Sequence, residues 1–273
     1  MPLAEAIDQA AGLRRLFSPE PAFRSLGVLG PDCRATARAG VALARGLSRR
    51  GERVLVVDEA RSPHHVGGLM GVMTRHTLAE AGRRGLLDIV QQAGEGVVLM
   101  AAPDGLEALA GMDEADLRDL TDDWRTRAEL PEWLLLNGGQ RSPDTSLAAA
   151  AQTRVLVLPG TRTRLADAYA VMKKAQAVSG GRAWWVLVDG AAADQAQILF
   201  AALGETARRF LGIVPEFLGH LPRDPAGAAT ASLEAGSLDR LAGDAAGEQQ
   251  VDFARFWQHM WLHSRMAAES VGV

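Results

Sequence analysis

The chain has 273 residues, 48% of them hydrophobic, so it can bury a sizeable core in one large or two small domains, which excludes fibrous and disordered classes. A formal net charge of −4 argues against a dedicated nucleic-acid binder, which needs a basic face. The single cysteine, Cys33, excludes a disulfide framework and is typical of a reducing compartment, so we expect a cytoplasmic protein. No apolar run is long enough to span a membrane.

Residues 3–17 predict a short amphipathic helix, because apolar side chains recur there at helical spacing: Leu3, Ile7, Ala10, Leu13 and Phe17. The stretch "SPEPAF" follows, and its prolines end the helix, so a stiff linker is expected before the next element. A detached helix suits partner binding. The alternative is that its charged residues form only a solvated face.

Strands and helices alternate through the middle of the chain. The first strand is predicted at 25–29, a helix at 36–49 and a second strand at "RVLVVD", residues 53–58. Further apolar strand candidates are "GVVLMAA", "WLLLNGG", "RVLVLPG" and "AWWVLVDG". This order predicts an α/β fold with a doubly wound, mostly parallel sheet flanked by helices. Residues 225–250, which are small, polar and rich in glycine, are expected to form a surface segment with weak helices.

The stretch "VDFARFWQHMWLHSRM" predicts a last amphipathic helix with an apolar stripe of Phe253, Phe256, Trp257, Met260 and Trp261. Two interpretations remain open: the stripe docks on the protein's own sheet, or it contacts a membrane surface. The chain is thus divided into an N-terminal partner-binding helix and linker at 1–24, an α/β domain at 25–240, and a linker and C-terminal helix at 241–273.

Three blocks carry a resemblance to a known family: "DQAAGLRRL" at 8–16, "TRLADAYAVMKKAQ" at 163–176 and "RRFLGIVPEFLGHLPRD" at 208–224. Their order and spacing resemble MinD-like P-loop proteins, and among these the flagellar number regulators FlhG and FleN. The first block is similar to the D-Q-A-x-x-L-R helix that, in this family, engages the SRP-type GTPase FlhF and stimulates its GTP hydrolysis. The resemblance covers most of residues 3–224.

The resemblance implies a regulator of flagellar number or placement with a MinD-like fold. Its implied partner is an FlhF-like GTPase, bound through Asp8, Gln9, Ala10, Leu13 and Arg14. The C-terminal helix corresponds in position to the family's membrane-targeting helix. This correspondence implies contact with the inner membrane or the cell pole.

The phosphate-binding loop departs from the family pattern. The Walker A sequence K-G-G-x-G-K-[ST] falls on "PDCRATA", so Pro31 replaces the signature lysine, Thr36 the phosphate lysine and Ala37 the Mg²⁺ ligand. Asp32 adds a negative charge where phosphate would lie, which opposes an anionic ligand. The full set of residues in this degenerate site is Gly30, Pro31, Asp32, Cys33, Arg34, Thr36, Ala37, Asp58 and Asn137.

The catalytic positions depart as well. Asp58 is kept, but Ala60 stands where the family has a water-orienting aspartate, and Asn137 where it has an aspartate associated with the metal. We therefore expect a pseudo-ATPase without catalytic residues or a metal site, with no cofactor unless the degenerate loop still holds ATP and Mg²⁺. It would be a monomer or an ATP-independent dimer. The alternatives are an ATPase cycling on the membrane and a nucleotide-independent peripheral membrane scaffold.

Overall fold

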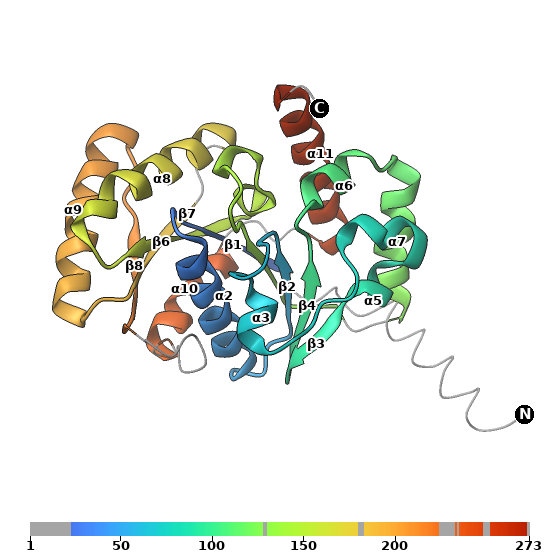
Figure 1. Ribbon diagram of the computed structural model, residues 1–273, viewed down its shortest axis with the longest axis horizontal. Coiled ribbons are helices and arrows are strands. Elements are labelled where there is room, and N and C mark those ends of the chain that lie inside the picture. The colour runs from blue at the N-terminus through green and yellow to red at the C-terminus, as the bar shows by residue number, and fades with distance from the viewer. Residues whose placement is uncertain are drawn as a thin grey trace, which may run out of the picture.

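The computed structural model describes residues 23–127, 130–179, 183–223, 233, 235–247 and 252–271. In these ranges the strands form one sheet in the order β3-β4-β2-β5-β1-β6-β7-β8, as drawn in Figure 1. The strands are β1 (Arg24–Leu29), β2 (Val54–Asp58), β3 (Gln91–Gly94), β4 (Val97–Ala101), β5 (Trp133–Asn137), β6 (Thr153–Pro159), β7 (Ala183–Asp189) and β8 (Glu216–Leu221). Of the predicted N-terminal helix and linker at 1–24, residues 1–22 lie outside the described residues, and Arg24 belongs to β1.

The helices are α2 (Cys33–Ser48), α3 (Val66–Met70), α4 (Ala81–Arg84), α5 (Leu86–Ile89), α6 (Gly105–Ala110), α7 (Glu114–Arg127), α8 (Leu165–Ser179), α9 (Ala193–Leu211), α10 (Ala235–Gly247) and α11 (Phe253–Val271). Four short 3-10 helices join them, namely η1 (Leu78–Glu80), η2 (Pro143–Thr145), η3 (Leu147–Ala150) and η4 (Arg162–Arg164). The doubly wound architecture predicted from the alternating pattern is confirmed.

The sheet lies between two layers of helices. Alternate residues along a strand point to opposite faces, so Val54 and Val56 of β2 pack on the layer of α2, α3 and α10, whereas Leu55 and Val57 pack on the other layer. That second layer contains α6, α7, α8, α9 and α11. Both faces of the sheet are therefore buried, which explains why its strands read as continuous apolar runs.

All the strands anticipated from apolar runs are present, but two others were not predicted. β3 begins with Gln91 and Gln92, and it pairs with β4 as an antiparallel edge strand. β8 carries Gly219 and His220, and its parallel pairing with β7 is shifted by an irregularity near Val186. Edge strands need no continuous apolar run, since one side of each lacks a neighbouring strand.

The C-terminal helix packs against the body of the protein. Phe253, Phe256, Trp257, Met260 and Trp261 are all buried in the core that α11 shares with α6 and α7. The indole N–H of Trp261 donates to the carbonyl of Met112 (2.9 Å), so α11 is also joined to the α6–α7 turn by a hydrogen bond. Of the two interpretations of this stripe, the structure shows the first, in which the stripe packs on the protein's own core. The stripe is not available to a membrane in this conformation.

The segment before α11 is less peripheral than expected. α10 buries Leu238 and Leu241 against the layer of α2, and Gly46 of α2 gives it room, since a Cβ at that position would lie 2.5 Å from Leu238 Cδ1. Helix α10 spans the predicted boundary at residue 240. Both α10 and α11 therefore contribute to the hydrophobic core of the α/β domain.

Candidate functional site

The candidate site lies where the chain order of the strands reverses. β1 sits between β5 and β6, and the chain leaves its carboxyl end through Gly30–Asp32 into α2. In open α/β sheets, ligands bind at the carboxyl ends of the strands at such a switch point. Gly30 is needed here because a Cβ would lie 2.8 Å from the carbonyl oxygen of Val157.

The N-terminus of α2 is capped by the protein itself. Asp32 is the N-cap residue, and its Oδ1 accepts hydrogen bonds from the backbone amides of Arg34 (2.9 Å) and Ala35 (3.0 Å). A helix N-terminus attracts anions because its first amides are unpaired and its dipole is positive there. The Asp32 carboxylate occupies this position.

The rest of the loop offers few groups to a ligand. Pro31 has no amide hydrogen. The Thr36 side chain is buried, and its hydroxyl donates to the carbonyl of Cys33 (2.9 Å). Ala37 is buried as well, and Arg34 is exposed. Cys33 is half-buried, with its Sγ 3.7 Å from Gln140 Nε2.

Asp58 and Asn137 meet beneath this loop. The amide of Asn137 donates to Asp58 Oδ1 (2.7 Å), and the same carboxylate accepts from the backbone amides of Ala60 (3.1 Å) and Val66 (2.6 Å). Burial raises the pKa of Asp58, while these hydrogen bonds act in the opposite direction. Asp58 therefore ties the ends of β2 and β5 to the start of α3, and its hydrogen-bonding capacity is largely used.

On the other side of the site, a buried ion pair joins α2 to the carboxyl end of β7. Arg38, on the second turn of α2, places Nη1 3.0 Å from Oδ1 of Asp189 at the end of β7. Its Nη2 donates to the carbonyl of Pro222 (2.9 Å), just after β8. Burial raises the pKa of Asp189 to about 6, and the positive charge of Arg38 opposes that shift. The pair holds α2 against the carboxyl ends of β7 and β8.

A second polar cluster lies behind the site, and the sequence analysis did not single it out. Glu59 follows Asp58, is buried, and accepts a hydrogen bond from the hydroxyl of Ser146 (2.5 Å). Burial raises the pKa of Glu59 to about 7, although Arg141 lies 3.8 Å from its Oε1. The buried ring of His263 on α11 donates through Nε2 to the carbonyl of Ser146 (3.1 Å). The end of β2 is thus linked through Ser146 to the C-terminal helix.

These residues do not fit a Mg²⁺-nucleotide. Phosphate binding by such a loop needs free amides and a lysine, and Mg²⁺ needs a hydroxyl or carboxylate ligand. Here the first amides of α2 bond Asp32, Thr36 and Ala37 replace the lysine and the hydroxyl, and the Asn137 amide faces Asp58. The hydrogen-bond donors and metal ligands at this position therefore do not match the Mg²⁺-nucleotide that the fold implies.

The chain is similar to known proteins in both sequence and fold. It is 28% identical over 189 residues to the antiactivator FleN of Pseudomonas aeruginosa, an alignment that covers 67% of this chain and 68% of FleN. A chain of the MinC:MinD cell division complex of Aquifex aeolicus superposes with a TM-score of 0.55 at 12% identity, over 92% of this chain and 96% of that one. The chain has a MinD-like fold and is similar in sequence to FleN.

Other solved structures support the same fold. A ParA family ATPase of Chlorobium tepidum has a TM-score of 0.50 at 15% identity, with 92% of this chain and 93% of that chain covered. A plasmid partition protein of Borrelia burgdorferi B31, solved with AMPPNP bound, also has a TM-score of 0.50, at 9% identity over 88% of this chain and 98% of that one. No family model matches the sequence.

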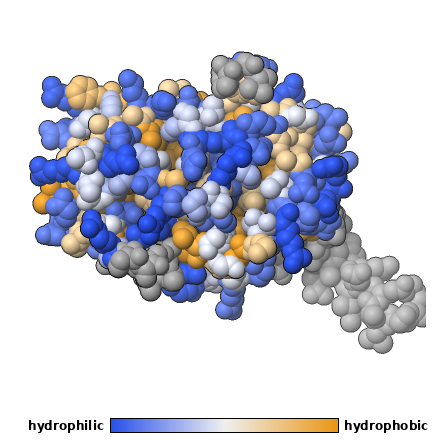
Figure 2. Space-filling model, in the orientation of Figure 1, coloured by the Kyte–Doolittle hydropathy of each residue, from blue (hydrophilic) through white to orange (hydrophobic). Residues whose placement is uncertain are grey.

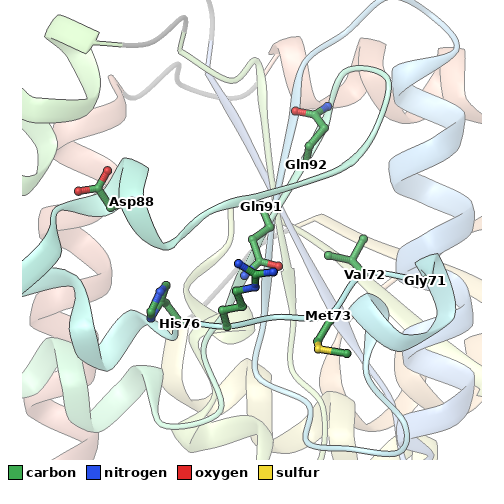
Figure 3. Close-up of a pocket in the computed structure, with 8 residues that line it drawn as sticks. Gly71, Val72, Met73, His76, Asp88, Gln91 and Gln92 are labelled. Carbon is green, nitrogen blue, oxygen red and sulfur yellow. The ribbon is translucent and has the colours of Figure 1, made fainter.

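Another groove of this fold lies away from the switch point. Figure 3 shows it between β3 and the segment after α3, with a volume of about 540 Å³ and Met73, His76, Asp88 and Gln91 among its lining residues. With its amide turned to satisfy both contacts, Gln91 donates to the Met73 carbonyl and accepts from the Arg75 amide. The side chain of Gln91 therefore bonds β3 to the segment after α3. The residues that line the groove do not indicate a particular reaction.

Two further classes of site find no support. Within the described ranges, no three His, Cys, Asp or Glu side chains cluster as metal ligands. His65 is the N-cap of α3, where its Nδ1 accepts from the Gly68 amide (2.9 Å), and His76 pairs with Glu80 (3.0 Å). In the part of the chain with described coordinates, no helix is both long and apolar enough to cross a bilayer.

The structure brings together most of the predicted site. Gly30 and Asp32 of the β1–α2 loop, Thr36 of α2, and Asp58 and Asn137 at the ends of β2 and β5 converge at the carboxyl ends of the central strands. The partner-binding set Asp8, Gln9, Ala10, Leu13 and Arg14 lies outside the described residues. Sequence reasoning missed Arg38, Glu59 and Ser146. Arg38 shares α2 with Arg34 and Arg45, so its charge alone did not distinguish it in the sequence.

Proposed function

We propose that the chain is a regulator of flagellar number or placement that binds an FlhF-like SRP-type GTPase through its N-terminal helix and acts without nucleotide. Similarity to the antiactivator FleN supports the regulatory role. The observation that carries the nucleotide-independent part is the Asp32 carboxylate bonded to the first amides of α2.

A triphosphate would meet a cost at this position. It would have to displace Asp32 from the amides of Arg34 and Ala35 and would then lie beside its negative charge. Each lost charge-assisted hydrogen bond costs about 1.5–3 kcal/mol, and about 1.4 kcal/mol is a factor of ten in affinity. Arg34 is the loop cation that faces solvent, and one arginine does not replace two lysines and a magnesium ligand.

The ion pair of Arg38 and Asp189 supports the same proposal. By resemblance, Asp189 stands where the family has an asparagine that contacts the nucleotide base. In this chain its carboxylate is engaged by Arg38, and both side chains are largely buried. A base entering there would separate the pair and leave a charge buried without a partner, which is strongly unfavourable.

Partner binding would reside in residues 8–14. This segment combines apolar Ala10 and Leu13 with charged Asp8 and Arg14, so a helix there would present a mixed face to a groove on the GTPase. The segment precedes a proline-containing linker, which separates it from the α/β domain. Its position therefore permits docking to a partner without rearrangement of the sheet.

The test is a binding titration with the GTPase domain of FlhF, with and without Mg-ATP. The full chain, a chain lacking residues 1–17, and the variants Arg14→Ala and Arg15→Ala are compared; Arg15→Ala is the matched control because it removes a neighbouring charge outside the proposed set. We expect saturable binding that is independent of ATP, lost on truncation, weakened by Arg14→Ala and kept by Arg15→Ala. Equal binding by the full and truncated chains, or binding that requires ATP, would overturn the proposal.

A further inference from the structure

The outer side of α11 carries an apolar strip. Leu262 is 48% exposed and Met266 61% exposed, and with Gln258 they recur every four residues, so they lie along one line of the helix. The opposite side of α11 is buried in the core. Helix α11 thus presents large apolar side chains on both sides, and only the inner side has a partner among the described residues.

This strip continues into a groove between α7 and α11. The groove has a volume of about 500 Å³, and Leu117 and Thr121 of α7 face Ala254 and Gln258 of α11 across it. Two ion pairs stand at its rim, Arg118 with Glu114 (3.1 Å) and Arg255 with Asp252 (3.2 Å). Groove and strip together form a surface from Ala254 to Met266, which we call the α11 outer strip.

The described chain begins beside this surface. Phe23 is buried, and its ring centroid lies 5.5 Å from that of Phe253 and 5.6 Å from that of Phe256, at the first turn of α11. The residues that precede Phe23 are therefore tethered near the first turn of α11, which is the end of the helix where the groove lies. The face of the molecule in Figure 2 mixes hydrophilic residues with small, separate hydrophobic areas, so no broad apolar surface competes for them on that face.

We propose that residues 3–17 dock on the α11 outer strip of the same chain, with the apolar line of Leu3, Ile7, Ala10, Leu13 and Phe17 against Leu262 and Met266. A 15-residue helix is about 22 Å long, and the strip from Ala254 to Met266 is about 18 Å long. The linker of residues 18–22 spans at most about 17 Å. The segment therefore has the length to reach the strip and to cover it.

The tether at Phe23 sets the direction of docking. Because Phe17 is the end nearest to Phe23, the docked helix runs antiparallel to α11. Asp8 then lies toward Arg265, which is exposed between Leu262 and Met266, and Arg14 lies toward Glu114 and Asp252 at the groove. Asp8 and Arg265 then carry opposite charges, whereas Glu114 and Asp252 are already paired with Arg118 and Arg255, so the tether rather than the groove charges favours this direction.

Docking would have a regulatory consequence, which rests on the proposed function. Ala10 and Leu13 belong both to the apolar line and to the proposed partner-binding set. They cannot contact α11 and the GTPase at the same time. The free segment is therefore the binding-competent state, and docking lowers the apparent affinity for the partner.

The test is amide hydrogen exchange of the full chain, measured over residues 3–17. In the wild type we expect protection that does not depend on protein concentration. The double variant L262D/M266D should increase the exchange rate of these amides by about tenfold or more, because it removes the docked state. The matched control F210D/V214D changes two other exposed side chains, 64% and 74% exposed, and should leave the exchange of residues 3–17 unchanged.

Three results would overturn the inference: unprotected amides at 3–17 in the wild type, equal protection in L262D/M266D, or protection that disappears on dilution, which would assign the strip to a second copy of the chain. The GTPase titration separates this from the proposed function. If docking is correct, L262D/M266D binds the GTPase several-fold more tightly than the wild type. If no variant binds the GTPase, the proposed function fails while the exchange result still decides the docking.

Discussion

Arg38 and Asp189 form a buried ion pair, 3.0 Å apart between Nη1 and Oδ1, that joins the second turn of α2 to the carboxyl end of β7. The two residues are 151 positions apart in the sequence. The pair lies at the switch point of the sheet, where other α/β proteins hold ligands. In this chain, two of the protein's own side chains bridge the elements that surround the site.

Arg38→Ala is expected to destabilise the protein by about 3–5 kcal/mol at pH 7, because it leaves the Asp189 carboxylate buried without its partner. Urea unfolding measures this. The double variant R38L/D189L removes both charges and should recover most of the loss, since it leaves no unpaired charge. If R38A and the double variant lose the same stability, the pair contributes through packing and not through charge.

Glu59→Gln is expected to change how stability depends on pH. The pKa of Glu59 is raised to about 7, so the folded state binds a proton that the unfolded state releases near pH 4.5. The contribution of this group is fully present below pH 4.5 and is lost as the pH rises to about 7, at a total of roughly 3 kcal/mol. Glu59→Gln should flatten the stability curve over this window. An unchanged slope between pH 4.5 and 7 would show that Glu59 is not the titrating group.

Trp257→Ala is expected to cost about 3–5 kcal/mol in the free energy of unfolding, because it removes a fully buried indole from the core under α11. Leu262→Ala, on the exposed side of the same helix, should cost less than about 1 kcal/mol. Chemical denaturation of both variants checks the contrast. Similar small losses for both would mean that α11 is not docked in solution, and the membrane interpretation of its stripe would regain support.

Asp32→Ala should lower stability by about 1 kcal/mol through loss of the N-cap of α2. Asp32→Asn keeps a capping oxygen without the charge, and its stability should stay within about 0.5 kcal/mol of the wild type. Thermal unfolding of the two variants distinguishes capping from charge. If Asp32→Asn is as unstable as Asp32→Ala, the carboxylate charge rather than the cap holds the helix end.

The fold was predictable because its central strands are buried on both faces, which gives short apolar runs such as "VLVV" in β2 and "LLL" in β5, and these runs alternate with helical patterns along the chain. The edge strands were not predictable in this way. Gln91 of β3 and Gly219 of β8 interrupt any apolar pattern, and neither strand has neighbours on both sides. Their pairing depends on the rest of the sheet.

The site was predictable in part. The resemblance to the family's phosphate-binding loop placed the site at 31–37, and the structure puts Asp32 on the amides of α2. The partners of the buried charges were not predictable, because Ser146 is 87 residues from Glu59 and meets it only through the topology of the sheet. The apolar stripe of α11 also left its partner open, since the same pattern suits a core and a membrane surface.

We propose that the protein acts without a nucleotide bound at the N-terminus of α2. Thermal unfolding with millimolar Mg-ATP or Mg-ADP tests this most directly. We predict an unchanged midpoint. A nucleotide present at 100 times its dissociation constant would add about 2.7 kcal/mol and raise the midpoint by roughly 5–10 °C. A saturable rise of that size, absent with ATP lacking Mg²⁺, would contradict the account and restore an ATP-dependent cycle.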